Sequence, residues 1–230
     1  MPTTRSTPAP HPLAKITLTE ARPLPVFLLL DSSGSMKADG KIEALNSAVQ
    51  EMLGTFAAEE PGRASIEVGA LVFGRAVQVH LAYQPAKSAL GQWHPLAAAG
   101  KTPMGSVFAK CTEMLEDHSL VPSRSYRPTL VLVSDGQPTD EWEKPLARLL
   151  GSPRSSKALR FAMAIGSDAD HTMLARFVDN PQYPVFRAHD AREIQKFFRW
   201  VTMSVTARSR SAVPNQATPP PIEEIEDFRY

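Results

Sequence analysis

The sequence predicts an α/β protein with a doubly wound, mainly parallel sheet, one antiparallel hairpin at its edge and helices on both faces. Continuous apolar runs, typical of strands buried on both faces, occur at residues 24–31 and within 127–136. Segments with helical apolar spacing separate the strands, and this alternation predicts a parallel sheet covered on both sides. Residues 64–74 and 76–83 are two strands joined tightly at Gly74-Arg75, which predicts the hairpin.

The other elements follow from the same patterns. A helix begins near Lys41, because apolar side chains from Ile42 to Phe56 fall on one face. Residues 91–102 are expected to be irregular, and a helix runs from about Pro103 to the neighbourhood of Asp117. The remaining expected elements are helix 140–150, strand 159–166, helix 171–178, strand 183–188 and helix 190–206.

Length and composition favour one main domain. The chain has 230 residues, which is enough for one large α/β core. We expect a Pro- and Thr-rich tail at residues 1–17, a domain at 18–207 and a second tail at 208–230. The acidic end of the last segment has two open interpretations, a solvated tail or a short docking helix, and we favour the tail.

Charge and cysteine content exclude several classes of protein. A net charge of +1 provides no electrostatic footprint for nucleic acid or an anionic membrane. The single cysteine, Cys111, forms no internal disulfide and is expected to be a buried helix residue. The first residues lack the apolar core of a signal peptide, and no stretch is long enough to span a membrane. We therefore expect a cytoplasmic protein.

Polar side chains gather where the strands are expected to end. Asp31 and Asp135 follow two of the most apolar strands, and ligands of open parallel sheets bind beyond those carboxyl ends. Ser33 and Ser35 follow Asp31 at alternate positions, and Thr102 precedes a predicted helix. Carboxylates and hydroxyls are hard oxygen ligands that suit Mg²⁺ or Mn²⁺ and argue against structural zinc.

Each of these residues also has a purely structural interpretation. Thr102 before Pro103 has the pattern of an N-cap followed by proline in the first turn. Other structural interpretations are a helix cap at Ser35 or Asp39, a turn at Asp135-Gly136, and a capping pair of Asp140 with Glu143. Together these interpretations predict no particular order along the chain, whereas a metal site does.

Further polar residues near these loops are expected to lie outside the site. Trp93 and His94 precede Thr102, and ordinary loop packing is favoured over a place at the rim of the site. Asp168 and Asp170 are interpreted as loop and helix-start residues.

Enzymatic alternatives fit the sequence poorly. A P-loop ending at "GKT" (100–102) needs a glycine where the chain has Pro95. A haloacid dehalogenase-type phosphatase needs a second aspartate where the chain has Ser33. A serine hydrolase needs Gly-x-Ser-x-Gly, but Met36 and Lys37 follow Ser35, and no general base is evident. We therefore expect no enzyme activity.

The motifs "DSSGS" (31–35), "KT" (101–102) and "SDG" (134–136) resemble the metal-ion-dependent adhesion site (MIDAS) of von Willebrand factor A (VWA) domains. Their order matches the family pattern, and the resemblance covers about residues 20–207. It implies that Ser33, Ser35 and Thr102 contact a metal directly, and that Asp31 and Asp135 act mostly through bound water. It also implies a docking module, in which a carboxylate from a protein partner completes the coordination of the metal.

The longer segments "LPVFLLLDSSGSM", "GKTPMGSVF" and "VLVSDGQPTDEWE" are similar to bacterial TerY-type VWA proteins linked to tellurium resistance. That resemblance implies a serine/threonine kinase and a metal-dependent protein phosphatase as partners. Phosphorylation is then expected in the terminal segments, at Thr3, Thr4, Ser6, Thr7 and Thr218. The alternatives are a VWA subunit of a larger ATPase or chelatase-like machine and, with less support, a metal-dependent hydrolase.

Overall fold

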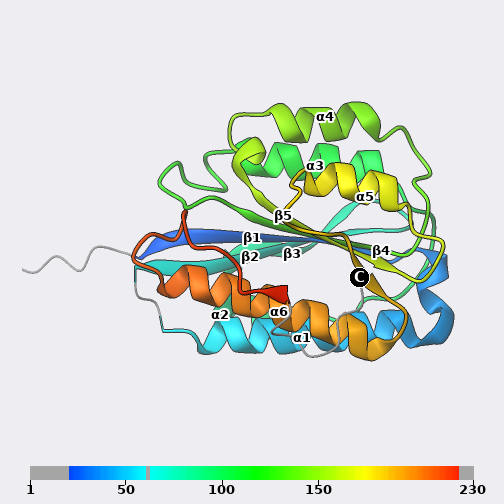
Figure 1. Cartoon of the computed structure of the whole chain (residues 1–230), viewed down its shortest axis with the longest axis horizontal. Helices are drawn as coiled ribbons and strands as arrows, with labels where there is room; N and C mark the ends of the chain where they lie inside the picture. Colours follow the sequence, from blue (N-terminus) through cyan, green and yellow to red (C-terminus); the bar gives the residue numbers. More distant parts are fainter. Residues whose placement is uncertain (1–20, 61–62, 223–230) are drawn as a thin grey trace, which may run out of the picture.

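The computed structural model describes residues 21–60 and 63–222 of the chain. A six-stranded sheet with the order β3-β2-β1-β4-β5-β6 crosses this part of the protein (Figure 1). The β2–β3 pair is antiparallel and the other neighbouring pairs are parallel, so the predicted fold class is confirmed. The strands are β1 (Arg22–Asp31), β2 (Ala64–Phe73), β3 (Gln78–Pro85), β4 (Thr129–Ser134), β5 (Leu159–Ile165) and β6 (Phe186–Ala188). The α-helices are α1 (Lys41–Ala58), α2 (Ala86–Gln92), α3 (Met104–Glu116), α4 (Glu143–Gly151), α5 (His171–Val178) and α6 (Ala191–Arg210), and the 3-10 helices are η1 (Gly34–Gly40) and η2 (Ser155–Lys157).

The sequence of β1 explains its place in the middle of the sheet. Val26, Leu28 and Leu30 belong to the apolar core on one face, whereas Phe27 and Leu29 belong to the core on the other face. A strand that is apolar on both sides loses all of its water contact only when helices cover both faces. β1 lies inside the sheet, where it pairs with β2 along one edge and with β4 along the other.

The helices form two layers around the sheet. α1, α2 and α6 cover one face, and α3, α4 and α5 cover the other (Figure 1). Cys111 lies on the inner side of α3 and is fully buried, as its place in the sequence predicts. Burial raises the pKa of its thiol to about 12.

Helix α2 is absent from the sequence-based expectations, which continued from a strand into an irregular stretch. It has only seven residues, and only Ala86 and Ala89 among them are buried. Two small side chains in two turns make no recognisable apolar period, so the helix depends on its contacts with α1 and β3.

Helix α6 continues to Arg210, three residues beyond the domain boundary predicted at residue 207. The chain beyond the helix then returns along it as far as the description reaches. The indole nitrogen Nε1 of Trp200 donates a hydrogen bond to the Pro220 carbonyl (3.0 Å), and Ile222 packs against the core. Residues 208–222 therefore belong to the folded domain, while residues 223–230 and the tail expected at 1–17 lie outside the described residues.

Candidate metal centre

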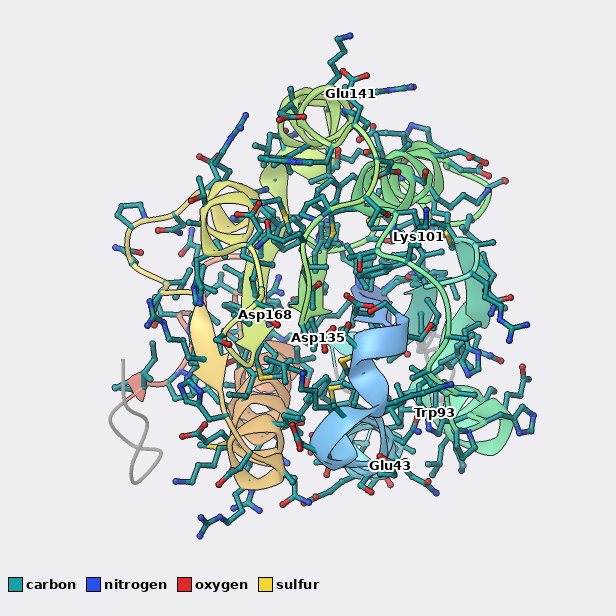
Figure 2. All side chains as sticks on the ribbon, turned by 90° about the vertical axis from the view of Figure 1, so that its right-hand side faces the viewer. Glu43, Trp93, Lys101, Asp135, Glu141 and Asp168 are labelled. Carbon is teal, nitrogen blue, oxygen red and sulfur yellow. The ribbon has the colours of Figure 1, made fainter. Side chains whose placement is uncertain are left out.

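Two neighbouring strands bring the predicted carboxylates to one edge of the sheet. β1 and β4 are parallel, with Leu30 opposite Val133, so Asp31 and Ser134 follow at the same level. Asp135 comes directly after β4 and is also buried. Figure 2 views this edge of the molecule and shows Asp135 near its centre.

The hydroxyls of the first loop lie against Asp135. Ser35 Oγ donates to Asp135 Oδ1 (2.7 Å), and Ser33 Oγ lies 3.4 Å from the same oxygen. The two serine oxygens are 2.9 Å apart. Three of the five predicted ligands are thus in direct mutual contact.

Thr102 reaches this cluster from a third loop. Gly34 N donates to Gly100 O (3.0 Å), which ties the first loop to the segment that carries Thr102. Gly136 lies next to both Thr102 and Ser35, because a Cβ atom built there would be 3.2 Å from Thr102 Oγ1 and 3.9 Å from Ser35 Oγ. The missing side chain of Gly136 therefore keeps a space open beside the hydroxyls.

Asp31 lies deeper than the other members of the cluster and is fully buried. Its Oδ1 accepts a hydrogen bond from Ser33 N (2.7 Å), and its Oδ2 accepts one from Ser134 Oγ (2.6 Å). Burial raises the pKa of Asp31 from 3.8 to about 6, although these two hydrogen bonds oppose the rise and the nearby Asp135 charge adds a little to it. The Asp31 carboxylate is thus held in place at an electrostatic cost.

A lysine completes the surroundings of Asp135. Lys41 Nζ lies 2.9 Å from Asp135 Oδ2, and the side chains are 19% and 0% exposed, respectively. The two oxygens of Asp135 therefore have different neighbours: Oδ1 faces the serine hydroxyls, and Oδ2 faces the ammonium group.

The capping interpretations fail for the predicted ligands. The N-cap position of α3 is Pro103 and not Thr102. The N-cap position of α1 is Gly40, and not Ser35 or Asp39. Neither of these two N-cap residues makes a side-chain capping hydrogen bond. The expected capping pair of Asp140 with Glu143 is also wrong. Asp140 instead accepts hydrogen bonds from the α3 amides of Gly105 (2.8 Å) and Ser106 (2.9 Å). Asp140, far away in the sequence, caps the helix for which Thr102 was a candidate.

Three neighbouring residues that are expected to lie outside the site make structural contacts. Asp170 is the N-cap of α5, where its carboxylate accepts from Met173 N. Trp93 packs edge-on against His80, with ring centroids 5.1 Å apart. His94 contributes its carbonyl oxygen to a contact with His80 Nε2 (2.7 Å).

The donor set fits a hard divalent cation. Serine and threonine hydroxyls and aspartate carboxylates are hard oxygen ligands of the kind that Mg²⁺ and Mn²⁺ prefer. All five predicted ligand residues carry oxygen. Among the described residues no group of three or more His, Cys, Asp or Glu side chains forms an alternative metal cluster.

Two residues of this centre are missing from the sequence-based prediction. Ser134 orients Asp31, and its position directly before Asp135 at the end of a buried strand is a usable sequence signal. Lys41 has no such signal, because a lysine in the first turn of an amphipathic helix is ordinarily solvated.

A family model of the von Willebrand factor type A domain matches residues 26–200. This match covers most of the chain and includes all five predicted ligand residues. The protein therefore belongs to the VWA family.

Solved structures agree on the fold. A von Willebrand factor type A protein from Catenulispora acidiphila superposes with a TM-score of 0.64 at 21% identity, over 81% of this chain and 43% of that chain. Proximal thread matrix protein 1 from the mussel byssus, described with a zinc-occupied MIDAS motif, gives 0.63 at 15% identity, over 80% and 49%. The ArnB paralog VWA2 from Sulfolobus acidocaldarius gives 0.56 at 17% identity, over 81% and 46%.

The chain spans less than half the length of each of these three proteins. Comparison with curated proteins gives no match. No helix in the described part of the chain is long and apolar enough to cross a membrane.

Proposed function

We propose that this VWA domain is a docking module that binds Mg²⁺ or Mn²⁺ and uses the metal to hold a carboxylate of a protein partner. The observation that carries the proposal is the meeting of three separate loops at one cluster of oxygens. Ser33, Ser35 and Asp135 contact one another, and Thr102 lies across the space beside Gly136. The fold alone does not require hydroxyls at these points.

The choice of ligands favours binding over catalysis. Ser33, Ser35 and Thr102 would hold the cation through neutral hydroxyls, with Asp31 and Asp135 behind them. A divalent cation held mostly by neutral oxygens offers a Lewis-acidic position that attracts an anionic ligand. We propose a non-enzymatic role on this basis.

The resemblance to TerY-type proteins supports a more specific setting. In this proposal the module acts in the cytoplasm with a serine/threonine kinase and a metal-dependent protein phosphatase, in a tellurium-resistance or related stress system. Thr218 is exposed and available for phosphorylation, whereas Thr3, Thr4, Ser6 and Thr7 lie outside the described residues. Mass spectrometry after incubation with the cognate kinase that finds no phosphate would contradict this part of the proposal.

The metal site is tested by removing one hydroxyl without changing the shape of the side chain. We expect calorimetry to detect Mg²⁺ or Mn²⁺ binding to the wild type, and Thr102→Val to weaken it about tenfold or more. Thr112→Val is the matched control, since Thr112 is buried in α3, where its hydroxyl donates to Phe108 O. Equal metal affinity in the wild type and Thr102→Val would remove Thr102 from the site.

Docking is tested separately, by pull-down of the cognate kinase and phosphatase with and without a chelator. We expect the chelator to release the partner, and Thr102→Val to capture less of it. Capture that is equal with chelator, without chelator and with Thr102→Val would contradict metal-dependent docking.

A further inference from the structure

Lys41 occupies a position that its sequence context does not suggest. As the first residue of α1, it follows Gly40, whose left-handed φ of 69° turns the chain from η1 into the helix. Its side chain extends to the carboxyl end of β4 and is only 19% exposed. Most lysines near a helix start remain in water, so this placement requires a compensating interaction.

That interaction is the ion pair with Asp135. Lys41 Nζ lies 2.9 Å from Asp135 Oδ2, and the Asp135 side chain is fully buried. Gly166 lies on another side of the ammonium group, because a Cβ atom built at Gly166 would be 3.5 Å from Nζ. The ammonium is therefore enclosed between the turns that follow β4 and β5.

The ammonium and the hydroxyl cluster use different oxygens of Asp135. Oδ1 accepts from Ser35 (2.7 Å), whereas Oδ2 faces Lys41. A cation held among the hydroxyls would approach from the Oδ1 side and would leave the Lys41 contact intact. The lysine charge would then remain beside the loaded site.

Lys41 changes the net charge of the site. With both carboxylates ionised, Asp31, Asp135 and Lys41 together carry −1, and a divalent cation brings the site to +1. Without the lysine charge the carboxylates carry −2, and the same cation brings the site only to zero. A site at +1 attracts a carboxylate ligand, whereas a neutral one does so less strongly.

We propose that Lys41 is a built-in counter-ion that weakens the binding of the divalent cation and strengthens the binding of an anionic ligand to the loaded site. This inference rests on the proposed metal-dependent docking function and names the residue that tunes it. The charge of Lys41 lowers the affinity for the metal and raises the selectivity of the loaded site for carboxylate-bearing partners. The metal then binds more tightly when such a partner is present, because the two binding steps are linked.

The test uses Lys41→Met, which removes the charge and keeps much of the side-chain volume. Calorimetry with MnCl₂ should show metal affinity rising about tenfold or more, because a nearby positive charge has been removed. Acetate is then titrated onto the Mn²⁺-saturated protein, and binding is followed by the relaxation of its methyl protons. We expect the acetate affinity to fall about threefold or more.

Three further variants separate this effect from a structural one. Lys41→Arg keeps the charge and should keep both affinities close to the wild type. Lys41→Gln keeps a hydrogen-bond donor for Asp135 without the charge, so it should reproduce the effects of Lys41→Met even if that variant folds poorly. Lys37→Met is the matched control, because Lys37 is exposed on the neighbouring 3-10 helix and should change neither constant.

The two proposals fail in different ways. Absence of Mn²⁺ binding by the wild type would overturn the docking function and this inference together. Intact Mn²⁺ binding, with metal and acetate affinities that stay unchanged or move in the same direction in Lys41→Met and Lys41→Gln, would overturn the role of Lys41 alone.

Discussion

Burial of the Asp31 carboxylate lowers the stability of the metal-free fold. It receives hydrogen bonds from Ser33 N and Ser134 Oγ, yet burial still raises its pKa to about 6. In the metal-free protein, ionised Asp31 therefore destabilises the fold at neutral pH. A cation nearby would remove this cost, so metal binding and stability are linked at this residue.

At the residue scale, we predict that Asp31→Asn stabilises the metal-free protein at pH 7. The rise in pKa from 3.8 to about 6 corresponds to about 3 kcal/mol, and a gain of about 1–3 kcal/mol is expected, since asparagine replaces one acceptor with a donor. The same variant should lose stabilisation by Mg²⁺. Denaturant unfolding in a chelator measures the stability of the metal-free protein. The same experiment in excess Mg²⁺ measures the stabilisation by the metal.

The sign of the pH dependence provides the control. In the unfolded chain Asp31 ionises near 3.8, and in the folded protein near 6, so the cost is complete above pH 6 and disappears below pH 4. The advantage of Asp31→Asn over the wild type should shrink accordingly as the pH falls from 7 to 4. An advantage of the same size at both pH values would contradict this account.

At the scale of elements, the start of α3 and the loop before α4 depend on each other. Asp140 accepts hydrogen bonds from Gly105 N, Ser106 N and Ser106 Oγ (2.7 Å). The approach is close, since a Cβ atom at Gly105 would lie 1.9 Å from the Glu141 carbonyl oxygen. The contact positions Thr102, because Thr102 lies just before α3 and its carbonyl accepts from Met104 N (2.8 Å).

We predict that Asp140→Ala lowers the free energy of unfolding by about 1–2 kcal/mol, as expected for the loss of a helix cap. It should also weaken metal binding, because Thr102 loses its support. Glu141→Ala is the control, since Glu141 is exposed and pairs with Lys144 at the surface. If Asp140→Ala lost stability but kept full metal affinity, the cap would have no part in positioning Thr102.

At the scale of the whole molecule, the chain after α6 completes the core around Trp200. The indole ring lies edge-on to Phe161 (4.6 Å between centroids) and is tilted against Phe186 (4.9 Å). Its nitrogen donates to Pro220 O, and the returning chain also accepts a hydrogen bond at Pro214 O from the buried Arg208 Nε (3.2 Å). These contacts make the returning segment a structural part of the domain.

A chain shortened to end at Ser211 should therefore be less stable by about 2 kcal/mol or more, because buried donors on Trp200 and Arg208 lose their acceptors. A chain that ends at Ile222 retains every contact described above and is the reference for the shorter chain. Thermal unfolding of the three proteins measures the difference. Equal melting temperatures for all of them would mean that residues 212–222 are dispensable.

The sequence by itself determined the fold class and the order of most elements, and it predicts the five residues of the candidate metal centre. It did so because these features have local causes. Continuous apolar runs mark β1 and β4, and Asp31 and Asp135 lie at the carboxyl ends of these parallel strands, which bring both carboxylates to one edge of the sheet.

Only the tertiary structure decided which polar groups pair with each other across the fold. Lys41 and Asp135 are 94 positions apart, and Asp140 caps a helix that begins about 35 positions earlier. Packing also determined the short helix α2 and placed residues 208–222 within the domain. Contacts between distant residues leave no period or spacing in the chain, since they depend on how close the folded elements bring their side chains.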